Sequence, residues 1–380
     1  MIKYKPILKK LNCVKIARYI LIGLALISTF FFTWFFLFFY KVPDLDIPEN
    51  ASEQEKIVLI DSWFEELNAQ NKFNGAVLIA KKGKPLLIKG HGFTNYHKNE
   101  KITKKSSFRL ASLSKQFTAA GIMLLKERGL IEYDHLVSKY IDNFPYQEVT
   151  IRSLLNHTSG VPDRYLDLAE DYKKAVDILS NKKAVNLLIM NHPKAEFVPF
   201  EKYEYSNTNY ILLARIVEVV SERTFEDYMK IELFNPLGMQ NTRVWNLLSK
   251  EKTFKNKTGG FHTFFGYATE MRPTFVDGVA GDGAVFSSVN DFLIWDQFWY
   301  ENELLTQDNL KEAFEIPSLK SDNVSTYGFG WGIHDNTTRH YGMWLAANTF
   351  IIRNTDKKTC IVLLDNSFNI FFRKIVERLQ

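Results

Sequence analysis

Cysteine is scarce in this 380-residue sequence, which contains only Cys13 and Cys360. Two cysteines cannot build the disulfide framework of a small secreted domain, and no group of cysteines and histidines has the spacing of a metal site. The sequence also contains neither His-Glu-x-x-His, a zinc-hydrolase motif, nor Gly-x-Ser-x-Gly, the nucleophile turn of α/β-hydrolases. We therefore predict no metal and no cofactor.

The first 41 residues contain no aspartate or glutamate, although they carry seven lysines and arginines. Because the whole chain has a net charge of +5, the remaining residues, 42–380, have a net charge of −2. The basic character therefore belongs to the N-terminal segment, and we predict no nucleic-acid partner.

No charged residue interrupts the run from Tyr19 to Tyr40. About 20 apolar helical residues span the roughly 30 Å hydrocarbon core of a bilayer. A cleavable signal peptide is the alternative, but its apolar part is usually about 7–15 residues long and ends at small residues, which residues 41–44 (KVPD) do not provide. The preceding positive charge predicts a cytoplasmic tail at 1–18, a single-pass anchor at 19–40 in the cell membrane, and an extracytoplasmic remainder.

After a linker at 41–51, residues 52–380 are predicted to form one catalytic domain. Short β-like runs joined by turns occur near both of its ends, namely Gly75–Ala80 with Pro85–Lys89 and Thr349–Arg353 with Thr359–Leu364. The middle, from about Ser112 to Phe298, has mostly helical patterns. This order predicts an α+β fold in which N- and C-terminal segments form one antiparallel sheet flanked by helices, with a mostly helical lobe inserted.

Two helices are predicted at the ends of this domain. Ser52 and Glu55 have the spacing of a capping box, which marks a helix N-terminus. A final amphipathic helix carries its apolar side chains at Ile370, Phe371, Ile375, Val376 and Leu379.

The pattern Ser-x-x-Lys occurs three times, at Ser112/Lys115, Ser180/Lys183 and Ser249/Lys252. Only the first copy opens a strongly apolar helix, whereas the other two lie in lysine-rich polar stretches. Positions i and i+3 share a helix face, so Lys115 should lie beside the Ser112 hydroxyl. A lysine stripped of water by an apolar interior can accept the serine proton and make the hydroxyl nucleophilic. Taken alone, Ser112 fits an ordinary N-cap residue better than it fits a nucleophile, and only the rest of the sequence reverses this preference.

Four segments, in the same order along the chain, resemble the serine β-lactamases and penicillin-recognising D,D-peptidases, in particular their class C-like branch. They are residues 108–120 (FRLASLSKQFTAA), 154–162 (LLNHTSGVP), 205–207 (YSN) and 281–288 (GDGAVFSS). The resemblance extends over about residues 70–366. The family's third motif, Lys-x-Gly or His-x-Gly on a strand, has two candidates. We assign it to His340-Tyr341-Gly342, which precedes the C-terminal strands, and reject Lys257-Thr258-Gly259, which lies in a polar loop.

The resemblance implies a role for each matching residue. Ser112 is the nucleophile, and Lys115 and Tyr205 share the work of the general base. The backbone N–H groups of Ser112 and Met343 form an oxyanion hole. Asn207 holds the substrate amide and positions Lys115, while His340, Gly342 and their strand orient the substrate. His157 is predicted to be structural, because the family gives that loop position no chemistry.

The expected function is that of a membrane-anchored serine hydrolase that cleaves an amide or ester through an acyl-serine. Because histidine stands where many family members have a cationic lysine, attraction for a substrate carboxylate is weaker. This favours a D,D-peptidase, D-aminopeptidase or esterase-like hydrolase over a β-lactamase. The substrate is a small molecule or peptide, with cell-wall peptides among the candidates. The alternatives are a β-lactamase, a non-hydrolytic penicillin- or peptide-binding sensor, and an inactive scaffold.

Overall fold

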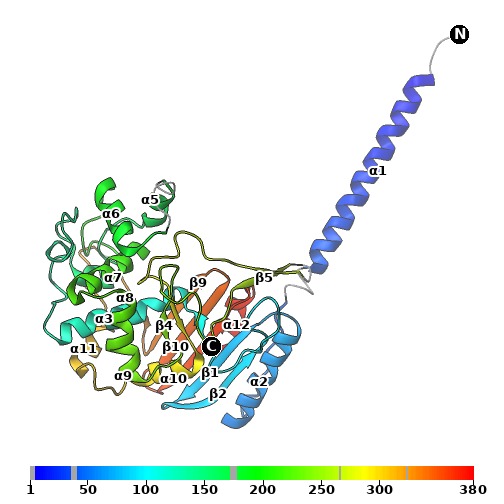
Figure 1. Cartoon of the computed structure of the whole chain (residues 1–380). Coiled ribbons are helices and arrows are strands. Elements are labelled where there is room, and N and C mark those ends of the chain that lie inside the picture. The colour runs from blue at the N-terminus through cyan, green and yellow to red at the C-terminus, as the bar shows by residue number, and fades with distance from the viewer. Residues whose placement is uncertain (1–4, 36–40, 172–177, 265–266, 322–323) are drawn as a thin grey trace.

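The computed structural model of the protein describes residues 5–35, 41–171, 178–264, 267–321 and 324–380. Its first helix, α1 (Lys5–Trp34), projects away from the rest of the chain (Figure 1). The stretch Lys15–Trp34 is long and apolar enough to cross a membrane, and it is not buried against the protein. The predicted tail (1–18) and anchor (19–40) also include residues 1–4 and 36–40, which lie outside the described residues.

Both ends of the domain contribute to one six-stranded antiparallel sheet, in the order β2-β1-β11-β10-β9-β8 (Figure 1). The N-terminal segment supplies β1 (Gly75–Lys81) and β2 (Lys84–His91). The C-terminal segment supplies β8 (Gly332–His334), β9 (Thr337–Trp344), β10 (Ala347–Asn354) and β11 (Thr359–Asp365). Because β1 pairs with β11, the predicted sheet from both termini and the α+β class are confirmed.

The sheet has an apolar core on each face, as the period-two alternation of its strands requires. On β1, Ala76 and Leu78 belong to the larger core, whereas Val77 and Ile79 belong to the smaller one. The larger core contains side chains of α3 (Ser114–Glu127) and α10 (Val289–Phe298). The smaller core contains side chains of α2 (Glu53–Ala69) and α12 (Phe372–Leu379).

The inserted lobe is mostly helical, as predicted. Its elements are α4 (Ile151–Leu155), α5 (Tyr165–Asp171), α6 (Asn181–Asn191), α7 (Asn207–Ser221), α8 (Phe225–Met229), the π-helical turn Lys230–Phe234 and α9 (Asn235–Leu237). Helix α11 (Gln307–Glu312) follows α10. Short strands complete the fold: β3 (Phe108–Arg109), β4 (Arg243–Val244) and β7 (Val285–Ser287) form one small sheet, and β5 (Phe261–Phe264) and β6 (Tyr267–Glu270) form a hairpin.

The capping box at the start of α2 is confirmed, because Ser52 and Glu55 bond each other's backbone N–H groups. The prediction for the last helix is wrong at its start. Helix α12 begins at Phe372, and Ile370 lies before it with 54% of its surface exposed. The reason is Asn369, whose Oδ1 accepts the Phe371 N–H while its amide donates to the Lys72 carbonyl, which fixes a turn here.

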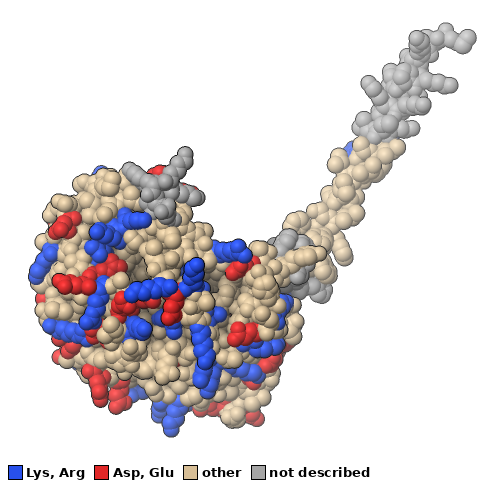
Figure 2. Space-filling model, viewed as in Figure 1, with Lys and Arg blue, Asp and Glu red and all other residues tan. Residues whose placement is uncertain are grey.

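Charged side chains of both signs are interspersed on the face of the domain seen in Figure 2, whereas the part of α1 that is not grey is almost entirely tan and so carries almost no charge. The distribution is that of an ordinary solvated surface joined to an apolar helix.

Candidate active site

Ser112 lies in a tight turn between strand β3 and helix α3. The turn is a 3₁₀ helix, Ala111–Leu113, and Ala111 adopts a left-handed conformation with φ of 49°. A non-glycine residue in this region costs about 1 kcal/mol or more, and such strain is common at active sites. The cap of α3 is Leu113, which makes no side-chain cap bond. The alternative interpretation of Ser112 as the N-cap is therefore wrong, and its half-buried hydroxyl has another partner.

That partner is Lys115, whose side chain is completely buried one helical turn from Ser112. Its Nζ donates to Ser112 Oγ at 3.2 Å, to Asn207 Oδ1 at 2.9 Å and to the backbone oxygen of Asp282 at 2.9 Å. All three acceptors are neutral oxygens, so these bonds orient the amine without holding it in an ion pair. The structure thus brings together three segments that are distant in sequence.

Tyr205 lies over the same amine. Lys115 Nζ is 4.9 Å from the centre of the Tyr205 ring. The ring of His157 also packs on the Tyr205 ring, at a centroid distance of 4.3 Å. Within the described residues, the Tyr205 hydroxyl is buried and has no hydrogen-bond partner. Since a buried hydroxyl normally finds a partner, the unused hydrogen-bonding capacity of this group fits the catalytic role predicted for Tyr205.

His157 supports this arrangement from the loop at 154–162. Its Nδ1 accepts the backbone N–H of Ser206 at 3.2 Å, which fixes the residue next to Tyr205. Burial, together with the positive charge of Lys115, holds the pKa of His157 well below its ordinary value. The ring is therefore neutral near pH 7, in keeping with the structural role predicted for it.

Asn207, the first residue of α7, is held by a residue that the sequence analysis missed. Its Nδ2 donates to Asp163 Oδ2 at 3.1 Å, and the backbone N–H of Thr208 donates to Asp163 Oδ1 at 2.9 Å. This pairing fixes the amide so that its oxygen faces Lys115. The signal that could have identified Asp163 is its position directly after the family-like loop that ends at Pro162.

Asp282 was also missed, although it lies within the family-like segment 281–288. Its contribution to Lys115 is a backbone carbonyl, which no sequence motif reveals. Its carboxyl accepts the Tyr165 hydroxyl at 3.0 Å, and burial raises the pKa of that carboxyl. Asp282 therefore ties the helical lobe to the lysine.

Strand β9 carries the third motif alongside the nucleophile. A Cβ added to Gly342 would lie 2.4 Å from the backbone oxygen of Leu110 and 3.0 Å from the backbone nitrogen of Ser112. The glycine therefore lets β9 approach the Ser112 turn closely, as the predicted oxyanion hole between the two segments would require. Met343, the proposed second donor, follows directly, and its side chain is 73% exposed.

Substitution of Gly342 by alanine should slow acylation of Ser112 about tenfold or more, because the new methyl group pushes β9 away from the turn. The second-order rate constant for labelling by a fluorescent penicillin measures the effect. Gly259→Ala is the matched control, since a Cβ there meets nothing closer than 3.9 Å. Equal rates in the two variants would contradict the close approach.

Both ring nitrogens of His340, which is predicted to orient the substrate, have partners within the protein. Its Nε2 is 2.8 Å from the Tyr327 hydroxyl and its Nδ1 is 2.7 Å from the Tyr341 backbone oxygen. A carbonyl can only accept, so Nδ1 carries the proton and Nε2 accepts from Tyr327. Burial and the nearby Lys115 lower the pKa of His340 to about 3, so the ring is neutral. Neither nitrogen is left for a carboxylate, and Tyr327 had no signal in the sequence.

The other motif copies have ordinary structural contacts. Ser180 caps α6 by accepting the Lys183 N–H, and the Ser249 hydroxyl donates to Glu226. Lys257 lies over the Trp245 ring, with Nζ 3.4 Å from its centre. The rejection of Lys257 as the third motif agrees with this position, because its segment bridges to Ser107 and is not part of β9.

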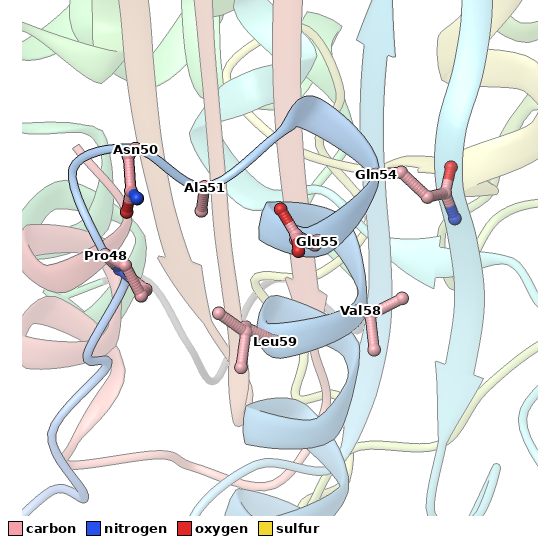
Figure 3. Close-up of a pocket in the computed structure, with 7 residues that line it drawn as sticks. All are labelled: Pro48, Asn50, Ala51, Gln54, Glu55, Val58 and Leu59. Atoms are coloured by element: carbon pink, nitrogen blue, oxygen red, sulfur yellow. The ribbon is translucent and has the colours of Figure 1, made fainter.

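A separate surface hollow lies between the linker and the start of α2 (Figure 3). Its lining is Pro48, Asn50, Ala51, Gln54, Glu55, Val58 and Leu59. None of these is a predicted site residue, and the one ionisable side chain among them, Glu55, is used in the capping box. The hollow therefore plays no part in the chemistry described here.

Comparison with known proteins places this geometry in a family. The Beta-lactamase family model matches residues 60–378. The chain is 34% identical to "Penicillin-binding protein 4*" of Bacillus subtilis (strain 168) over 328 residues, which cover 83% of this chain and 72% of that protein. It is 27% identical to "Protein flp" of Staphylococcus aureus (strain MW2) over 356 residues, covering 87% of this chain and 66% of the relative. Both relatives therefore extend beyond the matched region.

Solved structures share the fold. A penicillin-binding protein from Bacillus halodurans superposes with a TM-score of 0.71 at 24% identity, covering 87% of this chain and 100% of that one. A D-amino acid amidase from Ochrobactrum anthropi SV3 superposes with a TM-score of 0.69 at 21% identity, covering 86% and 97%. The class C-like branch remains a prediction. The chain belongs to the Beta-lactamase family, and it is a serine hydrolase.

Proposed function

We propose that this protein is a membrane-anchored hydrolase that cleaves amides or esters of small molecules or peptides through an acyl-enzyme on Ser112. The observation that carries the proposal is the buried amine of Lys115, which bonds Ser112 Oγ and lies over the ring of Tyr205, whose hydroxyl has no partner among the described residues. A nucleophile, a proton acceptor and an orienting amide thus meet at one half-buried turn, as covalent catalysis requires.

In the proposed reaction, Ser112 Oγ attacks the substrate carbonyl carbon and its proton passes to Lys115 or Tyr205. Backbone N–H groups of Ser112 and Met343 stabilise the oxyanion; loss of one such donor typically costs about 3–4 kcal/mol. Collapse of the intermediate breaks the C–N or C–O bond, and the proton moves to the leaving amine or alcohol. Water then attacks the acyl-serine by the same proton route and releases the acid.

The chemistry at β9 favours substrates without a free carboxylate next to the scissile bond. His340 is neutral, and both of its ring nitrogens are bonded within the protein. We therefore place D-aminopeptidase, amidase or esterase-like activity ahead of carboxypeptidase or β-lactamase activity. The names of the relatives, penicillin-binding protein and D-amino acid amidase, support an acyl-serine enzyme with a D-configured substrate.

A substrate comparison should reveal this preference. We expect kcat/KM for a D-amino acid amide or ester to exceed that for the matched D-Ala-D-Ala peptide with a free carboxylate by about tenfold or more, since the neutral His340 does not compensate the desolvated carboxylate. Initial rates with both substrates measure the ratio. An equal or reversed ratio would contradict the substrate preference, but it would not contradict the assignment of Ser112 as the nucleophile.

Incubation with a penicillin, a D-Ala-D-Ala peptide and a simple ester, followed by mass spectrometry of the intact protein, tests the general proposal. A hydrolase acquires the acyl group on Ser112 and loses it within the assay. Acylation without release would instead indicate the penicillin- or peptide-binding sensor. Folded protein that no substrate or fluorophosphonate acylates would contradict both.

Acid should destabilise the protein through His340. The unfolded chain binds a proton near its ordinary pKa of about 6.5, whereas the folded ring, with a pKa of about 3, stays neutral. Stability attributable to this ring is therefore unchanged above pH 6.5 and is lost as the pH falls from 6.5 towards 3, by about 3 kcal/mol at pH 4.5. Urea unfolding from pH 7.5 to 4.5 measures this, and His340→Gln should flatten the dependence. An unchanged slope in the variant would contradict the assignment.

The proposal also includes a membrane anchor at the N-terminus. The span Lys15–Trp34 fits a signal anchor, and the positive charge before it predicts a cytoplasmic N-terminus. The catalytic domain would then lie outside the cytoplasm, attached to the cell membrane. Protease protection of the domain in inverted membrane vesicles, and its digestion in intact spheroplasts, is the expected pattern.

A further inference from the structure

The segment that follows the apolar helix is bonded to the catalytic domain from Lys41 onwards. Lys72 Nζ donates to the Lys41 backbone oxygen at 2.6 Å, and Trp63 Nε1 donates to the Pro43 backbone oxygen at 3.0 Å. Val42 is 2% exposed and belongs to the smaller core. Because the predicted span ends at Tyr40, this attachment holds the neighbourhood of Lys72 close to the membrane surface.

Large apolar side chains are exposed around this attachment point. The loop at 366–371 contacts it directly, since Asn369 donates to the Lys72 backbone oxygen at 2.8 Å. In this loop Phe368 is 51% exposed and Ile370 is 54% exposed. The adjacent β5–β6 hairpin, tied to the loop by the Phe261 N–H bond to the Asn366 oxygen, carries Tyr267 at 81% exposure. Figure 1 shows β5 and α12 on the side of the domain where α1 departs.

The same loop is bonded to the turn that follows β9, the strand carrying the third motif. The Phe368 N–H donates at 2.9 Å to the backbone oxygen of Ala346, in the turn between β9 and β10. Gly342, which packs against the Ser112 turn, is four residues earlier on β9, a path of roughly 13 Å at about 3.3 Å per residue. The exposed Met343 lies between them. A membrane surface that touches this loop would therefore lie close to the Ser112 turn.

We propose that Phe368, Ile370 and Tyr267 form a bilayer-contacting surface, and that the enzyme takes its substrate from molecules carried at the bilayer surface. The inference rests on the anchor and the acyl-serine chemistry of the proposed function. Single exposed apolar residues are common and need no partner. These three differ because they lie on the loop bonded to the attachment point at Lys72 and on the hairpin bonded to that loop, and a bilayer accommodates phenylalanine and tyrosine at its interface. The substrate would be an ester or amide borne by a membrane-bound molecule.

Fluorescence of the full chain in vesicles tests the contact. In a Cys13→Ser background, Ile370→Cys is labelled with an environment-sensitive dye, NBD, while the buried Cys360 stays unlabelled. The control is Met190→Cys on α6, which is 71% exposed and lies in the helical lobe far from α1 in Figure 1. We expect blue-shifted emission and quenching by nitroxide-labelled phosphatidylcholine at 370 but not at 190. Equal quenching at the two positions would overturn the contact.

Kinetics test the consequence for substrate choice. The double variant Phe368→Asn, Ile370→Ser removes the apolar side chains, and asparagine tolerates the left-handed conformation of residue 368, whose φ is 49°. We expect hydrolysis of an ester displayed on vesicle lipids to fall about fivefold or more, while hydrolysis of the same ester free in solution is unchanged. Equal rates for the variant and the parent on vesicles would overturn the proposal. Fluorophosphonate labelling of Ser112 reports separately whether the hydrolase chemistry itself holds.

Discussion

Replacement of Ser112 by alanine should abolish labelling by fluorescent penicillin and fluorophosphonate and lower kcat/KM by a factor on the order of 10³ or more. The reason is that every later step of the proposed reaction acts on an acyl group that only this hydroxyl can accept. The fold should be retained. Ser112 accepts from Lys115 but caps no helix, so its removal breaks one hydrogen bond, worth about 1 kcal/mol.

The other two Ser-x-x-Lys copies are matched controls for this prediction. Ser249→Ala should keep full labelling, because its hydroxyl donates to Glu226 and accepts the Asn246 backbone N–H, and neither partner is a site residue. Ser180→Ala should also keep full labelling while losing about 1 kcal/mol of stability, since Ser180 is the N-cap of α6. Gel fluorescence with each probe and thermal unfolding separate the two effects. Labelling of Ser112→Ala at the parental rate would assign the nucleophile elsewhere.

The sheet was predictable because its residues carry their own periodicity. On β1, Val77 and Ile79 face one core and Ala76 and Leu78 the other, so the strand reads as a continuous apolar run between turn residues. The pairing of β1 with β11 followed only from placing both hairpins in one sheet. The start of α12 was not predictable, because the side chain of Asn369 ends the pattern through a bond to Lys72 from a remote segment.

The same distinction, between what local sequence indicates and what depends on remote contacts, holds for the candidate active site. The sequence could single out Ser112, Lys115 and Tyr205 as candidates because their side chains are of the types that act as nucleophile and base, and because their local sequence resembles a family. What positions them could not be predicted, since it depends on backbone atoms and distant partners. The Asp282 carbonyl has no side-chain signature, and Tyr327 meets His340 only after β9 joins the sheet. For the third motif, burial lowers the pKa of His340 to about 3, so the positive charge expected to be weak for a histidine is absent near pH 7.

Replacement of Lys115 by methionine should slow acylation by a factor of about 10² to 10⁴, the range associated with a positioned general base. Methionine fills a similar volume but cannot accept the Ser112 proton. The reaction of the variant with a fluorescent penicillin, followed as a second-order rate constant, measures the loss. Lys126→Met on the same helix is the control, because Lys126 lies near the surface 3.6 Å from Glu312 and touches no site residue.

Stability distinguishes a catalytic from a structural Lys115. The methionine variant leaves Asn207 Oδ1 and the Asp282 oxygen without their buried donor, which costs about 1–3 kcal/mol for each group. Against this, it removes a polar amine that is completely buried, and avoiding the desolvation of a buried polar group gains a comparable amount, about 1–3 kcal/mol. The two effects oppose each other, so we expect the melting temperature to change by only a few degrees while acylation collapses. A variant with a much lower melting temperature whose folded fraction is acylated at the parental rate would contradict the catalytic role. Lys115 would then be a structural residue, because acylation would not need its amine.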